Sequence, residues 1–184
     1  TLLNLIGGLD QPDEGQITIN GVDITSMSAN ALIDFRLKNI GFVFQSFNLI
    51  PVLTAKENVE LIMQLQGLDK EQRQERIDAL FSQIGLSDKI NSRPAQLSGG
   101  QQQRVAVARA LASKPQFVLA DEPTANLDTA SAANLLDIMA LLNKEEQMTF
   151  VFSTHDSRVI ERARRVITLV DGRIVSDTNQ VQVV

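Results

Sequence analysis

The chain has 184 residues, 43% of them hydrophobic and 21% charged, so it is long enough to bury one substantial core and too short for two full domains. Its 22 acidic residues outnumber 17 basic ones, and a net charge of −5 without a Lys/Arg cluster argues against nucleic acid as a partner. The absence of cysteine excludes disulfides, thiolate catalysis and cysteine-bound metals, and fits a reducing compartment such as the cytoplasm. The apolar runs are far shorter than the ~20 residues of a membrane-crossing helix, so any membrane role requires a partner.

Short β-branched or aromatic runs alternate along the chain with longer segments of helical periodicity. The strand-like runs lie at residues 16–20, 40–44, 117–120 and 149–153. This alternation predicts an α/β fold with a mainly parallel sheet and helices on both faces. Near the end, residues 166–170 and 173–176 flank Asp171-Gly172, a dipeptide that favours a tight turn, so we predict a C-terminal β-hairpin.

The middle of the chain has helical patterning without strand-like runs. Capping and termination signals predict three helices there: from Thr54 with Glu57 to Gly67, from Asp69 with Gln72 to Gly85, and from Ser98 towards Pro115. We therefore expect an all-helical subdomain at residues 45–114, inserted into an α/β core formed by residues 1–44 and 115–184.

Two adjacent carboxylates, Asp121 and Glu122, follow the strand-like run at residues 117–120. Ligands of open α/β sheets collect at the carboxyl ends of strands. Asp121 is placed to hold Mg²⁺, directly or through water, because this cation takes few protein carboxylates when it is bound to a triphosphate. Glu122 is placed to accept a proton from an attacking water. Taken alone, the pair is equally compatible with an ordinary solvated strand end.

The run Leu97-Ser98-Gly99-Gly100-Gln101 predicts an anion-binding helix start. Free amide groups and the positive end of the helix dipole favour phosphate, and glycine allows close approach. The commoner use of Ser-Gly is a plain helix N-cap. A chance match to all five residues is expected on the order of a few times in ten thousand chains of this length, which favours the anion site.

With this run the sequence resembles the ABC ATPase family, whose signature motif is LSGGQ, and the likeness covers nearly the whole chain. Gln45 matches the family's Q-loop glutamine, which contacts the metal or the attacking water. Asp121 and Glu122 match the Walker B aspartate and the catalytic glutamate. The resemblance implies a P-loop NTPase-type fold with ATP and Mg²⁺ as cofactors.

Two further motifs follow in the family's order. Residues 124–128 match the D-loop of the dimer interface, and the resemblance implies that Asp128, the last of them, contacts the bound nucleotide. His155, the only histidine, matches the switch histidine that contacts the γ-phosphate. A lone histidine is more often structural, but this one directly follows a predicted strand at the family's position.

Residues 1–9 resemble the helix that follows the GxxGxGKS phosphate-binding (Walker A) motif, with Thr1 directly after the Mg²⁺-binding serine. The chain opens without an initiator methionine or a signal-peptide pattern, so we expect an interior start, truncated after that motif. Since the loop and its lysine supply most of the charge neutralisation for the triphosphate, we expect the chain as given to be inactive although its parent is an enzyme.

The family implies that two such subunits pair head to tail, so that Ser98, Gly99, Gly100 and Gln101 of one face the nucleotide held by the other. Closure of the pair would act on transmembrane permease subunits seated over the helical subdomain, at the inner face of the bacterial inner membrane. Residues 8–10 and 47–59 are most similar to ATPases of lipoprotein release, macrolide export and cell division. The substrate is not encoded in this chain.

Two alternatives compete with a transporter ATPase. An ABC-type ATPase of DNA repair shares the signature motifs, but only 51 residues separate Gln45 from Leu97, which leaves no room for a coiled-coil arm. The chain is alternatively an inactive fragment or scaffold of such an ATPase.

Overall fold

The computed structural model describes residues 2–180. The helices are α1 (Leu2–Ile6), α2 (Ala29–Asn39), α3 (Ala55–Leu65), α4 (Lys70–Gln83), α5 (Gly99–Ala112), α6 (Thr129–Glu145) and α7 (Ser157–Arg162), with 3₁₀ turns at Ser87–Lys89 and Pro94–Gln96. The strands are β1 (Thr18–Ile19), β2 (Val22–Asp23), β3 (Ile40–Val43), β4 (Phe117–Asp121), β5 (Thr149–Ser153), β6 (Arg165–Val170) and β7 (Arg173–Asn179).

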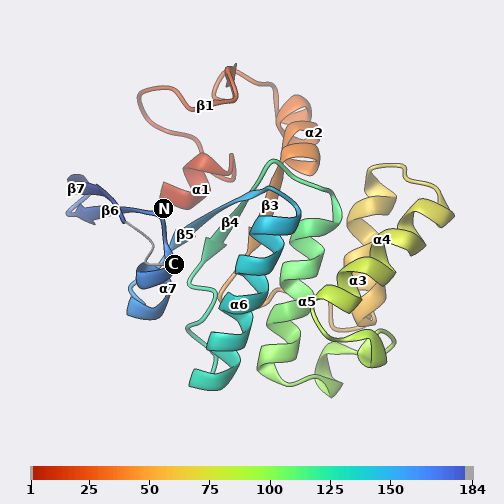
Figure 1. The fold of residues 1–184 in the computed structure, drawn as a ribbon. Helices are drawn as coiled ribbons and strands as arrows, with labels where there is room; N and C mark the ends of the chain where they lie inside the picture. Colours follow the sequence, from red (N-terminus) through yellow and green to blue (C-terminus); the bar gives the residue numbers. More distant parts are fainter. Residues whose placement is uncertain (1, 181–184) are drawn as a thin grey trace.

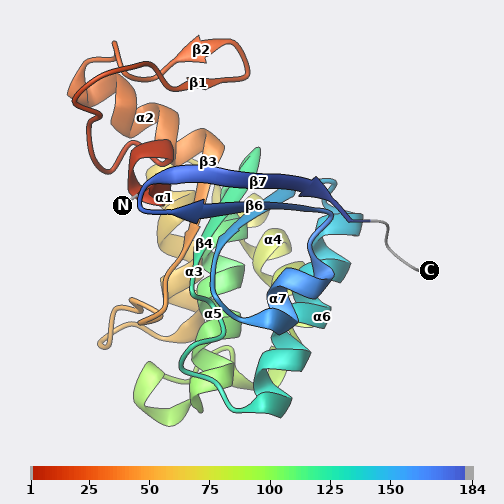
Figure 2. The same cartoon turned by 90° about the vertical axis from the view of Figure 1, so that its left-hand side faces the viewer.

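Strands β3, β4 and β5 form a parallel sheet in that order, as the alternating sequence pattern predicts. The predicted C-terminal hairpin is confirmed as antiparallel β6 and β7, with positive φ at Asp171 and Gly172. Within residues 2–180, the hairpin strands pair with each other and not with β5. Figures 1 and 2 show the hairpin at one end of the molecule, away from α3 and α4.

Helix α5 lies in the centre of the molecule, between the sheet and the other helices of the middle segment. Its buried side chains are mostly small, so neighbouring elements approach it closely: Gln103, Val105, Ala106, Val107, Ala108, Ala110, Leu111 and Ala112. Gly41 of β3 faces this helix, where a Cβ would lie 2.5 Å from the carbonyl oxygen of Ala110. The contact fixes the sheet against α5.

The predicted caps of the middle helices are confirmed. Thr54 and Glu57 form a capping box at α3, with the Thr54 N–H donating to Glu57 Oε2 at 2.7 Å, and Asp69 and Gln72 do the same at α4. Gly67 and Gly85 follow these helices with positive φ of 77° and 65°, a conformation that glycine adopts without strain.

The strand predicted at residues 16–20 is present but shorter, at Thr18–Ile19, and its partner β2 was not predicted. The structure has two short antiparallel strands, β1 and β2, joined at Asn20 and Gly21, whose φ values are 49° and 80°. An Asn-Gly pair favours a two-residue hairpin turn, which ends β1 at Ile19 and returns the chain as β2.

No helix among residues 2–180 has the length and apolar character required to cross a membrane.

Candidate functional site

The three predicted catalytic residues, Gln45, Glu122 and His155, lie beyond the carboxyl ends of three neighbouring parallel strands. Val43, the last residue of β3, pairs with Ala120, and Ala120 pairs with Phe152; β4 and β5 end one residue beyond this level. Gln45 and Glu122 each lie two residues beyond that level, and His155 lies three residues beyond it. The sheet therefore gathers these side chains at one edge, as expected for a ligand site in a parallel sheet.

Glu122 is the centre of a small polar cluster. Its Oε1 lies 2.7 Å from His155 Nδ1, and its Oε2 accepts a hydrogen bond from Thr154 Oγ1 at 3.2 Å. The His155 side chain is 87% exposed, whereas that of Glu122 is 22% exposed. The carboxylate is thus held in place while the imidazole remains open to a ligand.

The backbone at Glu122 is strained, with a φ of 45°. Left-handed conformation in a non-glycine residue costs free energy and persists only where the surroundings impose it. The Glu122 N–H donates to the Ser153 carbonyl at 2.9 Å, which ties the turn after β4 to the end of β5. At this turn the chain leaves the direction of β4, and the Glu122 carboxylate lies beside His155.

The loop after β4 also contacts both neighbouring loops. Asn126 Nδ2 donates to the Gln45 carbonyl at 3.0 Å. The buried Thr124 hydroxyl donates to Asp156 Oδ2 at 2.7 Å. These two bonds join the predicted Q-loop, D-loop and switch loop, and the sequence patterns did not predict them.

Asp156 also forms an ion pair with Arg158, whose Nη2 lies 2.7 Å from Oδ2. Hydrogen bonds from the Arg158 guanidinium, with a further one from Thr124, hold the pKa of the Asp156 carboxyl well below its ordinary value of 3.8. A carboxylate of this kind stabilises the fold while it is ionised.

We predict that the free energy of unfolding falls as the pH is lowered from about 5 to about 2, in part because of Asp156. The unfolded chain binds a proton near pH 4, whereas the folded Asp156 resists it until lower pH, so its stabilising contribution is lost in that range. Asp156→Asn should flatten this acid limb in urea titrations at several pH values. An unchanged slope would contradict the assignment.

Ser98 caps helix α5. Its Oγ accepts from the Gln101 N–H at 3.3 Å, and Gln101 Oε1 accepts from the Ser98 N–H at 2.9 Å, which forms a capping box. The plain N-cap considered from the sequence is therefore present. The first turn carries Gly99 and Gly100, both half-buried, at the positive end of a 14-residue helix.

The model of the ABC transporter family matches residues 1–125. The chain belongs to the ABC transporter family. It is an ATP-binding protein of that family, and it is similar to several other members.

The chain is 46% identical over 178 residues to the lipoprotein-releasing system ATP-binding protein LolD of Anaeromyxobacter dehalogenans, covering 96% of this chain and 74% of LolD. It is 43% identical over 182 residues to the macrolide export ATP-binding/permease protein MacB of Pasteurella multocida, covering 99% of this chain but only 28% of MacB. A dimeric structure of the ATP-binding cassette MJ0796 with ADP and Pi has a TM-score of 0.87 at 41% identity, covering 97% of this chain and 78% of that one.

These similarities confirm three predictions. The family is that of ABC ATPases, the fold is the P-loop NTPase type, and the resemblance to lipoprotein-release and macrolide-export ATPases is real. Of the predicted site residues, Thr1 lies outside the described residues.

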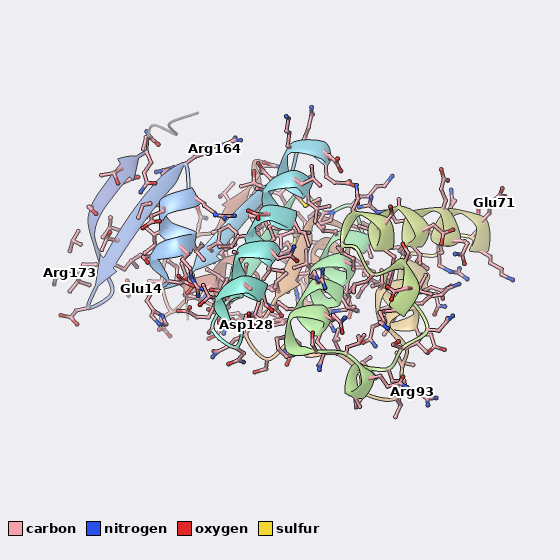
Figure 3. All side chains as sticks on the ribbon, turned by 60° about the horizontal axis from the view of Figure 1, so that its bottom comes forward. Glu14, Glu71, Arg93, Asp128, Arg164 and Arg173 are labelled. Carbon is pink, nitrogen blue, oxygen red and sulfur yellow. The ribbon has the colours of Figure 1, made fainter. Side chains whose placement is uncertain are left out.

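In this ABC protein, Asp128 is the N-cap of α6, and both its carboxylate oxygens accept hydrogen bonds from Ser131 at 2.9 and 2.6 Å. These bonds lower the pKa of Asp128 below its usual value. Figure 3 shows Asp128 at the start of α6, on the side of the molecule where α5 also begins. Its contact with nucleotide stays a prediction.

The two glycines of the signature run have different surroundings. A Cβ on Gly100 would lie 2.9 Å from Ser131 Oγ and 3.0 Å from Ser131 Cβ, whereas a Cβ on Gly99 would lie 3.6 Å from the Phe47 ring. Gly100 thus serves the packing of α5 against α6. Gly99 has room for a methyl group, so the fold does not require glycine there.

We predict that Gly100→Ala lowers the free energy of unfolding by about 1–3 kcal/mol because it overpacks the α5–α6 contact. Gly99→Ala should change it by less than about 0.5 kcal/mol, as an unstrained substitution does. Urea unfolding of both variants measures this difference. Equal destabilisation by the two substitutions would show that the fold requires glycine at Gly99 as well as at Gly100.

A metal ion at this site would have few protein ligands. Within residues 2–180, no three His, Asp or Glu side chains gather as a metal site. Asp121 and Gln45 are both exposed at the carboxyl edge of the sheet and offer hard oxygen donors. Such a sparse set fits Mg²⁺, which keeps several waters and takes its remaining ligands from phosphate.

Proposed function

We propose that this chain is the ATP-binding and hydrolysing subunit of an ABC transporter. The supporting observation is the cluster at the carboxyl edge of the sheet, where Glu122 is held against His155 by a strained turn and three neighbouring loops are tied together. Such a constellation is costly for folding alone and suits a reaction on a bound phosphate.

In this proposal each side chain has a defined role. Glu122 orients the attacking water and accepts its proton, since its carboxylate is fixed by Thr154 and His155. His155, exposed beyond β5, contacts the γ-phosphate. Asp121 and Gln45 hold Mg²⁺, which when bound would neutralise phosphate charge.

We also propose that a second copy completes the site. The start of α5, with Ser98 exposed and Gly99 not required by the packing of its own chain, offers amide groups and a positive helix end to nucleotide held by the partner copy. Gln101 supports that turn through the capping box. The similar cassette MJ0796 forms a dimer with ADP and Pi, which agrees with this arrangement.

Transmembrane permease subunits are the proposed membrane partners, contacting the helical subdomain at residues 45–114. A groove of about 460 Å³ runs between α2, β3, α3 and α5 and is lined mainly by apolar side chains, including Ile33, Phe42, Ile50 and Ile62. Ile33 and Ile50 are 56% and 38% exposed. A groove of this kind suits a partner's segment, which would place the protein on the cytoplasmic face of the inner membrane.

The DNA-repair alternative is disfavoured. Helices α3 and α4 have 11 and 14 residues, and the loops between them are short, so the middle segment forms a compact bundle rather than an arm.

Calorimetric titration of Mg-ATP tests the proposal. The 184-residue sequence contains no GxxGxGKS pattern, so we expect no detectable heat from it. A form in which a segment with that pattern is joined before Thr1, here named the P-loop-bearing form, should bind Mg-ATP with micromolar affinity. Hydrolysis by the second form supports an ATPase subunit. Binding without hydrolysis would support the scaffold alternative. Binding of Mg-ATP by the 184-residue chain itself would show that residues other than a GxxGxGKS loop hold the phosphates.

A further inference from the structure

Gln103 is a fully buried polar side chain in the first half of α5. It has an exposed fraction of 0% and lies in α5, two residues after the end of the LSGGQ run. Within residues 2–180, its Oε1 has no hydrogen-bond partner. Because burying an unpaired amide oxygen costs free energy, packing alone favours an apolar side chain at this position.

The amide nitrogen of Gln103 contacts both loops of the candidate site. Nε2 donates to the Pro123 carbonyl at 2.9 Å and to the Phe44 carbonyl at 3.3 Å. Pro123 directly follows Glu122, and Phe44 directly precedes Gln45. One buried amide therefore joins the backbone next to the proposed base with the backbone next to a proposed metal ligand.

Both loops need such support because their backbones are irregular. Glu122 has a φ of 45°, and Phe47 and Asn48 have φ values of 58° and 51°. Left-handed turns of non-glycine residues relax unless outside contacts hold them. A second side chain of α5, Arg109, donates to the carbonyls of Phe47 and Asn48, so the same helix holds the outer part of the first loop.

We propose that Gln103 is a positioning residue that fixes the spacing of Gln45 and Glu122 and couples it to the helix that begins at Ser98. It touches neither nucleotide nor metal and acts through the two carbonyls. The inference rests on the proposed ATPase function for its catalytic consequence. The positioning itself is a property of the chain without nucleotide.

Gln103→Met is the test variant, because methionine has similar length and volume and favours helix but cannot donate to the carbonyls. Gln102→Met is the matched control, because it is the same change one residue earlier. Gln102 Nε2 donates to the carbonyl of Leu97, which lies just before α5, at 3.1 Å, and not to either loop of the site. Should Gln103→Met fail to fold, Gln103→Asn, which keeps the amide but is one methylene too short, replaces it.

Amide hydrogen exchange in the 184-residue chain measures how firmly the two loops are held. In Gln103→Met three loop N–H groups should exchange about tenfold faster or more, with the amides of α4 and α6 unchanged. Those of Phe47 and Ala125 are hydrogen-bonded within the two loops, and that of Glu122 donates to the Ser153 carbonyl at the end of β5. Gln102→Met should leave the loop amides as they are. Unchanged loop exchange, or acceleration spread over the whole fold, would overturn the proposal.

Steady-state ATP hydrolysis by the P-loop-bearing form measures the effect of Gln103 on catalysis. Gln103→Met should lower kcat about 10- to 100-fold with little change in the KM for Mg-ATP, because misplaced catalytic groups slow the reaction more than they weaken binding. Equal losses in Gln102→Met, or a full kcat in Gln103→Met, would overturn it. If the unsubstituted form binds Mg-ATP and does not hydrolyse it, the proposed function fails, and exchange alone decides the role of Gln103.

Discussion

Glu122→Gln in the P-loop-bearing form is expected to lower kcat for ATP hydrolysis by about 10²- to 10⁴-fold, the usual contribution of a general base. Glutamine keeps an oxygen that accepts from Thr154, which bonds Glu122 Oε2 at 3.2 Å, so the loop should retain its shape. It cannot take up a proton. Phosphate release measures the loss, and calorimetry should show Mg-ATP affinity within about threefold of the parent, since the change affects the transition state and not the ground state.

The same variant should accumulate as a nucleotide-bound dimer, because the pair closes on ATP and hydrolysis no longer opens it. Light scattering with and without Mg-ATP detects this change in mass. Glu71→Gln is the control: it is the same substitution at an exposed position in the first turn of α4, far from the sheet edge. A Glu122→Gln variant that hydrolyses ATP at the parental rate would remove Glu122 from the mechanism.

Local signals in the sequence were sufficient for much of the fold. Strand β5 begins and ends where the apolar run predicts, and the Asp171-Gly172 turn and the capping boxes of α3 and α4 are all short-range features. Once three parallel strands are predicted, their carboxyl ends must share an edge, so the convergence of Gln45, Glu122 and His155 follows from topology.

Other parts of the site depend on contacts between distant segments. Asn126 and Gln45 are 81 residues apart, and Thr124 and Asp156 are 32 apart, so no periodicity or spacing connects them. The φ of 45° at Glu122 is equally hidden, because glutamate has no preference for the left-handed region. Tertiary packing imposes it through the bond to Ser153.

Gln103 illustrates the same limit within a predicted helix. Next to Gln101 and Gln102 it belongs to a polar run that favours a solvated helix face, yet it is fully buried. Its acceptors, Phe44 and Pro123, lie 59 and 20 residues away. Only the packing of α5 between two loops turns this side chain inward.

Gly41→Ala is expected to be among the most destabilising single substitutions, lowering the free energy of unfolding by about 3 kcal/mol, at the upper end of ordinary overpacking. The new Cβ would lie 2.5 Å from the carbonyl oxygen of Ala110 and 3.0 Å from Val118 Cγ2. The first of these atoms is helix backbone and cannot rotate away, so β3 and α5 must separate. Urea unfolding of the 184-residue chain measures the change.

The double variant Gly41→Ala/Val118→Ala separates the two contacts. It removes Val118 Cγ2 but leaves the Ala110 carbonyl in place, so it should be no more stable than Gly41→Ala alone; recovery would show that the side chain, and not the helix backbone, is the obstacle. Since β3 leads directly into Gln45 and α5 carries Gln103, the same displacement should speed amide exchange at Phe47. The glycine that sets the spacing of strand and helix thereby also sets the geometry of the proposed catalytic edge.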